Sequence, residues 1–161
     1  MPDSNDTAAT TRKFAADRTL IRLARWLRLM GADVFCDQSL SAAATLERAR
    51  AEGRSMLTRD KRLLNAADTL YIEHHLFRDQ LREVLVRFPF DPHRRAFTRC
   101  SLCNNLLRHV SRDSIRRRVP PFVFAGNDHF AVCDSCDKVY WPATHLTRAL
   151  REIDDLESVV P

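Results

Sequence analysis

Apolar and polar positions follow two different periods over the first ninety residues. Four short apolar runs predict β-strands at Lys13–Ala16, Ala32–Cys36, Ser55–Thr58 and Thr69–Ile72. Apolar residues at three- and four-residue spacing predict helices between and after them, at Arg18–Met30, Ala42–Ala51, a short segment ending at Ala66, and Phe77–Phe88. Alternating strands and helices predict an α/β fold with a parallel sheet covered by helices.

This pattern stops at the segment Pro89-Phe90-Asp91-Pro92. Beyond it we expect a short basic helix at Arg112–Val119, two short strands after Pro120-Pro121, and a last helix from about Thr144. We therefore predict five segments: a disordered N-terminus (1–11), an α/β domain (12–88), a linker (89–96), a small zinc-ribbon domain (97–150) and an acidic tail (151–161).

Four of the five cysteines form two C-x-x-C pairs, and their ligand set is Cys100, Cys103, Cys133 and Cys136. Each pair places two thiolates on one tight turn, and two such turns complete a tetrahedral set for a structural zinc ion. The alternatives are unrelated buried cysteines or a redox pair. Cys36 is left over, and we expect it to be a small buried apolar residue.

Three aspartates, Asp17, Asp37 and Asp60, each follow a predicted strand. In a parallel sheet these positions meet at one edge, where three carboxylates would repel one another unless a cation offset them. Mg²⁺ or Mn²⁺ suits such oxygen ligands and supports phosphodiester hydrolysis, so these residues are candidate catalytic ligands. Asp79, near the start of a helix, is a fourth candidate. Alternatively, each aspartate only caps a helix or closes a turn.

Arginines recur at spacings of four, three and three in the first helix, which predicts a basic stripe suited to phosphate contacts. We expect an RNA-binding surface that also includes Arg59 and the triplet in the second domain. Its candidate residues are Arg18, Arg22, Arg25, Arg28, Arg59, Arg116, Arg117 and Arg118. The alternative is an ordinary solvated helix face.

Charge and composition agree with a soluble protein that meets a polyanion. The chain carries a formal charge of +5 over 161 residues, and its last eleven residues are acidic, so the first 150 carry +8. No apolar stretch is long enough to span a membrane, and the polar N-terminus predicts no secretory signal. We expect a cytoplasmic protein.

Several of these segments together resemble the Mut-seven C-terminal ribonuclease domain family. They are residues 20–33 (LIRLARWLRLMGAD), Leu57-Thr58-Arg59-Asp60, Gln80-Leu81, Arg99-Cys100 to Asn104, Val119-Pro120-Pro121 and Val139-Tyr140-Trp141. The resemblance runs from about Phe14 to Thr147. It implies a PIN-like nuclease domain fused to a zinc ribbon, with the three aspartates at the family's acidic positions.

The chain departs from that family at two places. Ala42-Ala43-Ala44 stand where members commonly carry acids, and Ile21 stands where they tend to have glycine. Two hypotheses follow. The first is a divalent-metal-dependent ribonuclease acting on RNA, with tRNA or the ribosome as possible partners. The second is a non-catalytic RNA- or ribosome-binding protein that keeps the fold and the zinc ribbon.

Overall fold

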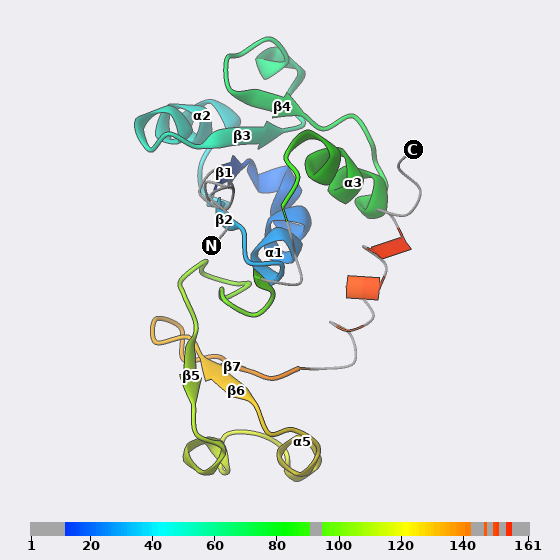
Figure 1. Cartoon of the computed structure of the whole chain (residues 1–161). Coiled ribbons are helices and arrows are strands. Elements are labelled where there is room, and N and C mark those ends of the chain that lie inside the picture. Colours follow the sequence, from blue (N-terminus) through cyan, green and yellow to red (C-terminus); the bar gives the residue numbers. More distant parts are fainter. Residues whose placement is uncertain (1–11, 91–94, 143–146, 148–149, 152–153, 156–161) are drawn as a thin grey trace, which may run out of the picture.

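A computed structural model describes residues 12–90, 95–142, 147, 150–151 and 154–155. Several predictions concern residues outside these ranges: the disordered N-terminus, the middle of the linker, and most of the last helix and of the acidic tail. The structure contains a sheet module (residues 12–90) and a cysteine module (residues 95–142), which Figure 1 shows one above the other.

The sheet module is built on four parallel strands in the order β2-β1-β3-β4. The strands are β1 (Lys13–Ala16), β2 (Asp33–Phe35), β3 (Ser55–Thr58) and β4 (Thr69–Tyr71). The helices are η1 (Arg18–Leu20), α1 (Ile21–Leu29), α2 (Ala42–Ala51), η2 (Lys61–Leu63) and α3 (Phe77–Arg87). The α/β class and the parallel sheet are therefore confirmed.

Helices cover both faces of this sheet because neighbouring strand residues point to opposite sides. Phe14 and Ala16 face the larger core, which α1 and α3 complete with Leu23, Leu27 and Val84 among others. Ala15, between them, packs with Leu46, Ala49 and Met56 under α2. In Figure 1, α1 and α3 lie together while α2 lies on the opposite side of the strands.

The cysteine module has its own antiparallel sheet in the order β5-β6-β7. Its elements are β5 (Arg108–Val110), η3 (Arg112–Ile115), α5 (Pro121–Gly126), β6 (Phe130–Val132) and β7 (Val139–Tyr140). The helix predicted at Arg112–Val119 forms only as the 3-10 helix Arg112–Ile115, and Pro120 disfavours helical geometry at the predicted last residue, Val119. A small core of Ile115, Val119, Val123, Phe130 and Val132 holds this end together.

The two modules are joined by polar contacts at strand β2, an edge of the parallel sheet. Val34 turns its N–H and C=O away from β1; the N–H donates to Asn104 Oδ1 (3.0 Å) and the C=O accepts from Arg28 Nε (2.9 Å). Gly31, at φ +89°, lies against Arg95, where a Cβ atom would come within 2.2 Å of the Arg95 carbonyl oxygen. The edge strand is thus capped by side chains and is not open to another strand.

Candidate functional site

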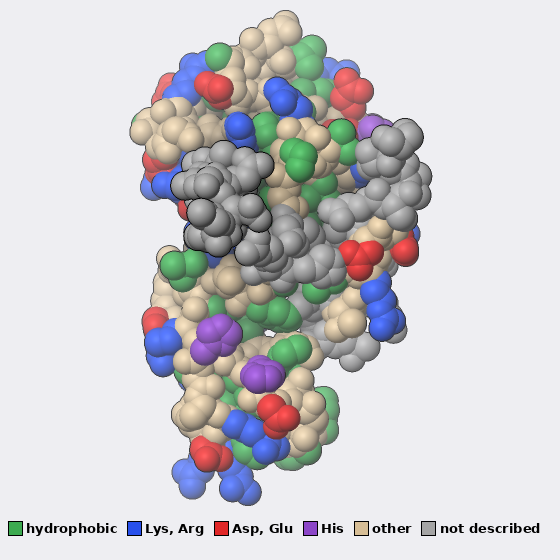
Figure 2. Space-filling model, viewed as in Figure 1, with side chains coloured by type: hydrophobic (Ala, Val, Ile, Leu, Met, Phe, Trp, Pro, Cys, Tyr) green, Lys and Arg blue, Asp and Glu red, His purple; other side chains and the backbone are tan. Residues whose placement is uncertain are grey.

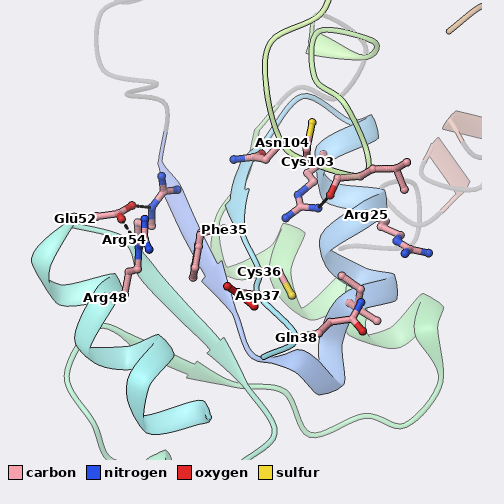
Figure 3. Close-up of a pocket in the computed structure, with 13 residues that line it drawn as sticks. Arg25, Phe35, Cys36, Asp37, Gln38, Arg48, Glu52, Arg54, Cys103 and Asn104 are labelled. Atoms are coloured by element: carbon pink, nitrogen blue, oxygen red, sulfur yellow. Dashed lines mark hydrogen bonds and ion pairs between the residues drawn. The ribbon is translucent and has the colours of Figure 1, made fainter. Parts of the chain in front are cut away.

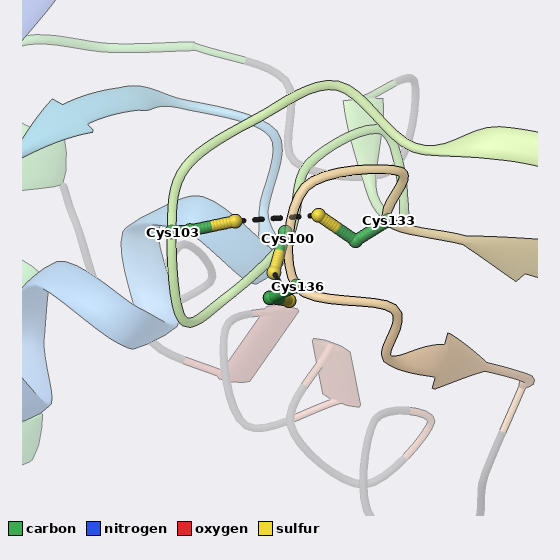
Figure 4. A group of neighbouring side chains, drawn as sticks. All are labelled: Cys100, Cys103, Cys133 and Cys136. Carbon is green, nitrogen blue, oxygen red and sulfur yellow. Dashed lines mark hydrogen bonds between the residues drawn. The ribbon is translucent and has the colours of Figure 1, made fainter.

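The four cysteines of the two C-x-x-C pairs gather at one point, as Figure 4 shows. Their sulfur atoms all lie within 4.8 Å of one another, with Cys100 and Cys136 at 3.5 Å and Cys103 and Cys133 at 3.3 Å. A tetrahedral zinc ion with Zn–S bonds of about 2.3 Å holds its sulfurs about 3.8 Å apart. The donor set and its spacing therefore fit zinc.

Both cysteine turns have the same backbone geometry. The residue after each second cysteine, Asn104 or Asp137, has a positive φ (69° and 59°). Each donates its N–H to the carbonyl of the first cysteine, at 3.0 and 2.8 Å. Asn and Asp tolerate this left-handed conformation better than other non-glycine residues, which is why they close these turns.

Tyr140 supports the cluster from β7. Its hydroxyl lies 3.0 Å from the Cys100 Sγ and accepts from the Ser101 N–H. Burial disfavours the Cys100 thiolate, but the Tyr140 hydroxyl and backbone N–H groups outweigh it and lower the pKa of Cys100 to about 6. A thiolate is the form that ligates a metal.

The carboxyl ends of three parallel strands carry the predicted aspartates along one edge of the sheet. Asp17 follows β1, and the strand order places Asp37, after β2, on one side of it and Asp60, after β3, on the other. Neighbouring strands are about 4.8 Å apart, so the strands that precede Asp37 and Asp60 are separated by two spacings, about 10 Å. The predicted shared edge is present.

The three carboxylates do not converge on one point, which corrects our expectation that they would share an ion's coordination sphere. Among the described residues, the four cysteines form the only group of three or more Cys, His, Asp or Glu ligand atoms within 4.8 Å. Each aspartate instead accepts the N–H two residues on, at Thr19, Ser39 and Arg62. Strand spacing separates the side chains, and these local turns direct each one back to its own loop.

Asp17 is the most buried of the three, at 2% exposure. Its Oδ1 accepts from the N–H and the hydroxyl of Thr19, at 2.8 and 2.5 Å. Its Oδ2 accepts from the Thr58 hydroxyl at 2.5 Å and the Arg59 N–H at 2.9 Å. All four acceptor positions of this carboxylate are therefore occupied.

The other acidic candidates have different surroundings. Asp60 pairs with Arg62, whose hydrogen bonds lower the pKa of this half-buried carboxyl to about 2. Asp79 lies in the first turn of α3, close enough to His74 for its charge to help raise the pKa of that imidazole. The main cause of the raised pKa of His74 is its hydrogen bond with Glu83. Asp79 thus belongs to a separate group beyond β4.

The arginines of the predicted stripe lie in different surroundings. Arg18, Arg22 and Arg25 are exposed, and Arg22 lies over the Phe77 ring at 4.6 Å. Arg28 is only 2% exposed and donates to the carbonyls of Ser101 (3.1 Å) and Leu102 (2.8 Å) as well as to Val34. Arg28 was predicted to bind RNA; in the structure its guanidinium group is buried and joins the two modules, which sets it apart from the exposed arginines of the stripe.

The remaining basic candidates do not continue that stripe. Arg59, at the carboxyl edge, donates its N–H to Asp17 and its guanidinium group to His75. Arg116, Arg117 and Arg118 are exposed and follow η3 at the far tip of the cysteine module, where Figure 2 shows basic side chains. Arg118 is paired with Asp137 at 2.7 Å.

The comparisons with known proteins give one match. The sequence model of the Mut7-C RNAse domain matches residues 12–153, nearly the whole chain. The chain belongs to this family. Membership confirms the resemblance noted from the sequence and indicates a ribonuclease-type function and interaction with RNA. No curated protein and no solved structure matches. None of the described helices of this Mut7-C RNAse domain is both long and apolar enough to cross a membrane.

This Mut7-C RNAse domain also has a groove that sequence reasoning did not identify. It has a volume of about 440 Å³ and lies between α1, β2, α2 and the first cysteine turn (Figure 3). We call it the intermodule groove; its walls include Arg25, Phe35, Asp37, Arg48, Cys103 and Asn104. Arg48 and Phe35 were missed because they lie on different elements, and only the fold brings them together.

Proposed function

We propose that this protein is a ribonuclease with a PIN-like sheet module, which hydrolyses RNA phosphodiester bonds at the carboxyl edge of that sheet. The observation that carries the proposal is the position of Asp17. The chain belongs to a ribonuclease family. Asp17 is a buried carboxylate at the end of an interior strand, and Asp37 and Asp60 follow the strands on either side.

We propose further that the reaction depends on Mg²⁺ or Mn²⁺. Mg²⁺ is usually bound by one or two carboxylates together with substrate phosphates and water, so a three-carboxylate cluster is not required. Asp17 with one flanking aspartate would hold such an ion, which supplies Lewis acidity and an activated water. Since the acceptor positions of Asp17 are full, the hydroxyl of Thr19 or Thr58 must first rotate away. The backbone N–H bonds can remain.

The cysteine module is proposed to be a zinc ribbon with a structural role. Its four thiolates would fill all four positions of a tetrahedral zinc ion and leave none for substrate. The proposal keeps the predicted division into domains at 12–88 and 97–150. The ribbon then positions RNA while the sheet edge carries out hydrolysis.

A cleavage assay on labelled single-stranded RNA tests this function. Protein stripped with EDTA is resupplied with Zn²⁺ alone or with Zn²⁺ and Mn²⁺, so that the cysteine module is loaded in both samples. We expect cleavage only with Mn²⁺, and none by Asp17→Asn. Asp128→Asn makes the same chemical change at an exposed position of the cysteine module and is the matched control. Equal cleavage by Asp17→Asn and wild type would exclude this site.

The second candidate is a non-catalytic RNA-binding protein. Two observations favour it: the full set of hydrogen bonds on Asp17, and the start of α2 at Ala42-Ala43-Ala44, which supplies no acid to the edge. This candidate predicts that the protein binds RNA in the same samples but leaves it intact with either metal.

A further inference from the structure

We propose that the intermodule groove binds a short single-stranded segment of RNA and guides it to the carboxyl edge of the sheet. This inference rests on the proposed function, because it names the path of the substrate to that site. Figure 3 shows the groove with Arg25 and Arg48 on opposite sides and Asp37 between them. Asp37 belongs both to the groove wall and to the row of aspartates at the edge.

The charge of the groove suits a phosphodiester backbone. Its walls carry four arginines and two acids. Arg28 and Arg54 are committed to the protein: Arg28 to three carbonyls, and Arg54 to Asp33 at 2.7 Å and Glu52 at 2.6 Å. Arg25 differs, since it is exposed and no described residue accepts a hydrogen bond from its guanidinium group. It is therefore available to a phosphate.

Arg48 is the second available arginine. Among the described residues it forms an ion pair with Glu52 only, at 2.6 Å, and Glu52 is already held by Arg54. The Arg48 side chain is 54% exposed, and an exposed ion pair of this kind contributes at most about 1 kcal/mol, so a phosphate can replace Glu52. Arg25 and Arg48 thus offer two phosphate contacts from opposite walls.

A stacking surface lies between these two arginines. The guanidinium carbon of Arg48 lies 4.5 Å from the centre of the Phe35 ring, which is half-buried at the end of β2. Unstacked bases bind to aromatic rings and to planar guanidinium groups. A base can therefore stack on Arg48, or on Phe35 when Arg48 turns to a phosphate. Duplex RNA does not offer an unstacked base, so the groove fits a single strand.

The size and the support of the groove agree with this ligand. A volume of about 440 Å³ is in the range of roughly 300–1,000 Å³ typical of small-ligand sites, which accommodates one or two nucleotides and not a duplex. The wall formed by Cys103 and Asn104 is fixed to β2 by the Asn104 hydrogen bonds to Val34 and Asp33 (3.0 and 2.8 Å). The groove is thus preformed, which limits the entropy lost on binding.

Fluorescence anisotropy with a labelled eight-nucleotide single-stranded RNA tests the proposal. Binding is measured on zinc-loaded protein without added Mg²⁺ or Mn²⁺, and a gel checks that the RNA stays intact. We expect Arg25→Glu/Arg48→Glu to weaken binding at low salt by roughly tenfold or more and to lower the salt slope by about 1.4, the value for two lost phosphate contacts on a single strand. Phe35→Leu keeps an apolar side chain and should weaken binding about fivefold through lost stacking.

Arg50→Glu is the matched control, since Arg50 is an exposed arginine of α2 that does not line the groove. It should bind within about twofold of wild type. If the double variant also binds within twofold of wild type with an unchanged salt slope, the groove proposal is overturned, whatever the outcome of the cleavage assay. If duplex RNA binds as tightly as the single strand and responds equally to the variants, the single-strand assignment is overturned. Wild-type binding that depends on Arg25 and Arg48 without any cleavage supports the groove and removes only the proposed hydrolysis.

Discussion

The arginines of α1 have separate roles because of the helical repeat. Each residue turns the helix by about 100°, so every three-residue step from Arg22 to Arg25 to Arg28 moves back by about 60°. Arg22 meets Phe77 of α3, Arg25 opens to the intermodule groove, and Arg28 reaches the cysteine module. Arginines at these spacings therefore lie on successive faces of the helix, and the last of them, Arg28, is buried.

Arg28→Lys should destabilise the protein although it keeps the charge. The guanidinium group serves three carbonyls, of Val34, Ser101 and Leu102, whereas one ammonium group cannot reach all of them. A buried acceptor without a partner costs about 1–3 kcal/mol, and we expect a loss of that size in the free energy of unfolding. Urea unfolding followed by circular dichroism measures it. Arg25→Lys, three residues earlier and exposed, should leave the midpoint unchanged; equal midpoints for both variants would contradict the role given to Arg28.

Asp17→Asn should also reduce stability, independently of any effect on RNA cleavage. Asparagine can keep the acceptor that faces Thr19, but its NH₂ group then faces the Arg59 N–H, and two donors cannot pair. We expect a loss of about 1–3 kcal/mol in the free energy of unfolding. Thermal melts of Asp17→Asn and of Asp128→Asn measure this loss. If the two variants melt like wild type, the hydrogen bonds of Asp17 contribute nothing to stability.

Residue types and spacing were enough to predict the cysteine cluster but not the arrangement of the aspartates. Each C-x-x-C pair lies on one turn, so its geometry is local and can be read from the sequence. The distance between Asp37 and Asp60 depends instead on the strand order and on turns that compete for each carboxylate. The burial of Arg28 likewise depends on a module that begins some seventy residues later.

At the scale of elements, Asp33 links strand β2 to Arg54, just before β3, and to Asn104 of the first cysteine turn. Its Oδ1 accepts from Arg54 at 2.7 Å and from Asn104 at 2.8 Å, and Arg99 lies 3.6 Å from its Oδ2. Burial alone would raise the pKa of Asp33, but the hydrogen bonds from Arg54 and Asn104 outweigh it and lower that pKa. The carboxylate therefore stabilises the folded state when ionised.

Asp33 should make stability depend on acid pH. Because its folded pKa is lowered, its contribution is fully present above the unfolded value of about 3.9 and is lost as the pH falls through the folded pKa. Between pH 6 and pH 3 the melting temperature of wild type should fall further than that of Asp33→Asn, which has already lost the charge. Differential scanning fluorimetry across this range measures both slopes, with Asp128→Asn as the control that keeps the wild-type slope. Parallel slopes for wild type and Asp33→Asn would refute this role.

Element boundaries could be predicted where local signals were strong. The predictions at Lys13–Ala16, Ala42–Ala51 and Ser55–Thr58 match β1, α2 and β3, since these segments have clear apolar periods and Ser41 caps α2. Strand β5 was not predicted, because its three residues include the exposed polar pair Arg108 and His109. Its pairing with β6 stabilises it, and that pairing is not visible locally.

The whole molecule depends on contacts between its modules. The cysteine turn that binds the proposed zinc is the same turn that caps β2 and forms a wall of the intermodule groove. Asn104 follows Cys103 directly, and the carbonyls of Ser101 and Leu102, between the first two cysteines, accept from Arg28. The metal site, the edge strand β2 and the groove are therefore parts of one structural unit.

Removing the metal should loosen β2 without unfolding the sheet module. The free energy of binding a structural zinc ion stabilises the folded form of the turns that bind it, so chelation should release the first cysteine turn. Val34 would then lose Asn104 as the acceptor for its N–H, whereas Ala15 on the interior strand β1 keeps its partners in the sheet. Amide hydrogen exchange before and after chelation measures both: exchange at Val34 should rise by at least tenfold and exchange at Ala15 should stay near its original rate.

Cys133→Ser should give the same pattern without chelator. Adding Zn²⁺ should restore protection to the wild type alone. If Val34 stays protected after the metal is lost, the turn keeps its place on β2 without the ion. If Ala15 exchanges as fast as Val34, the two modules unfold together, and the metal stabilises the entire fold.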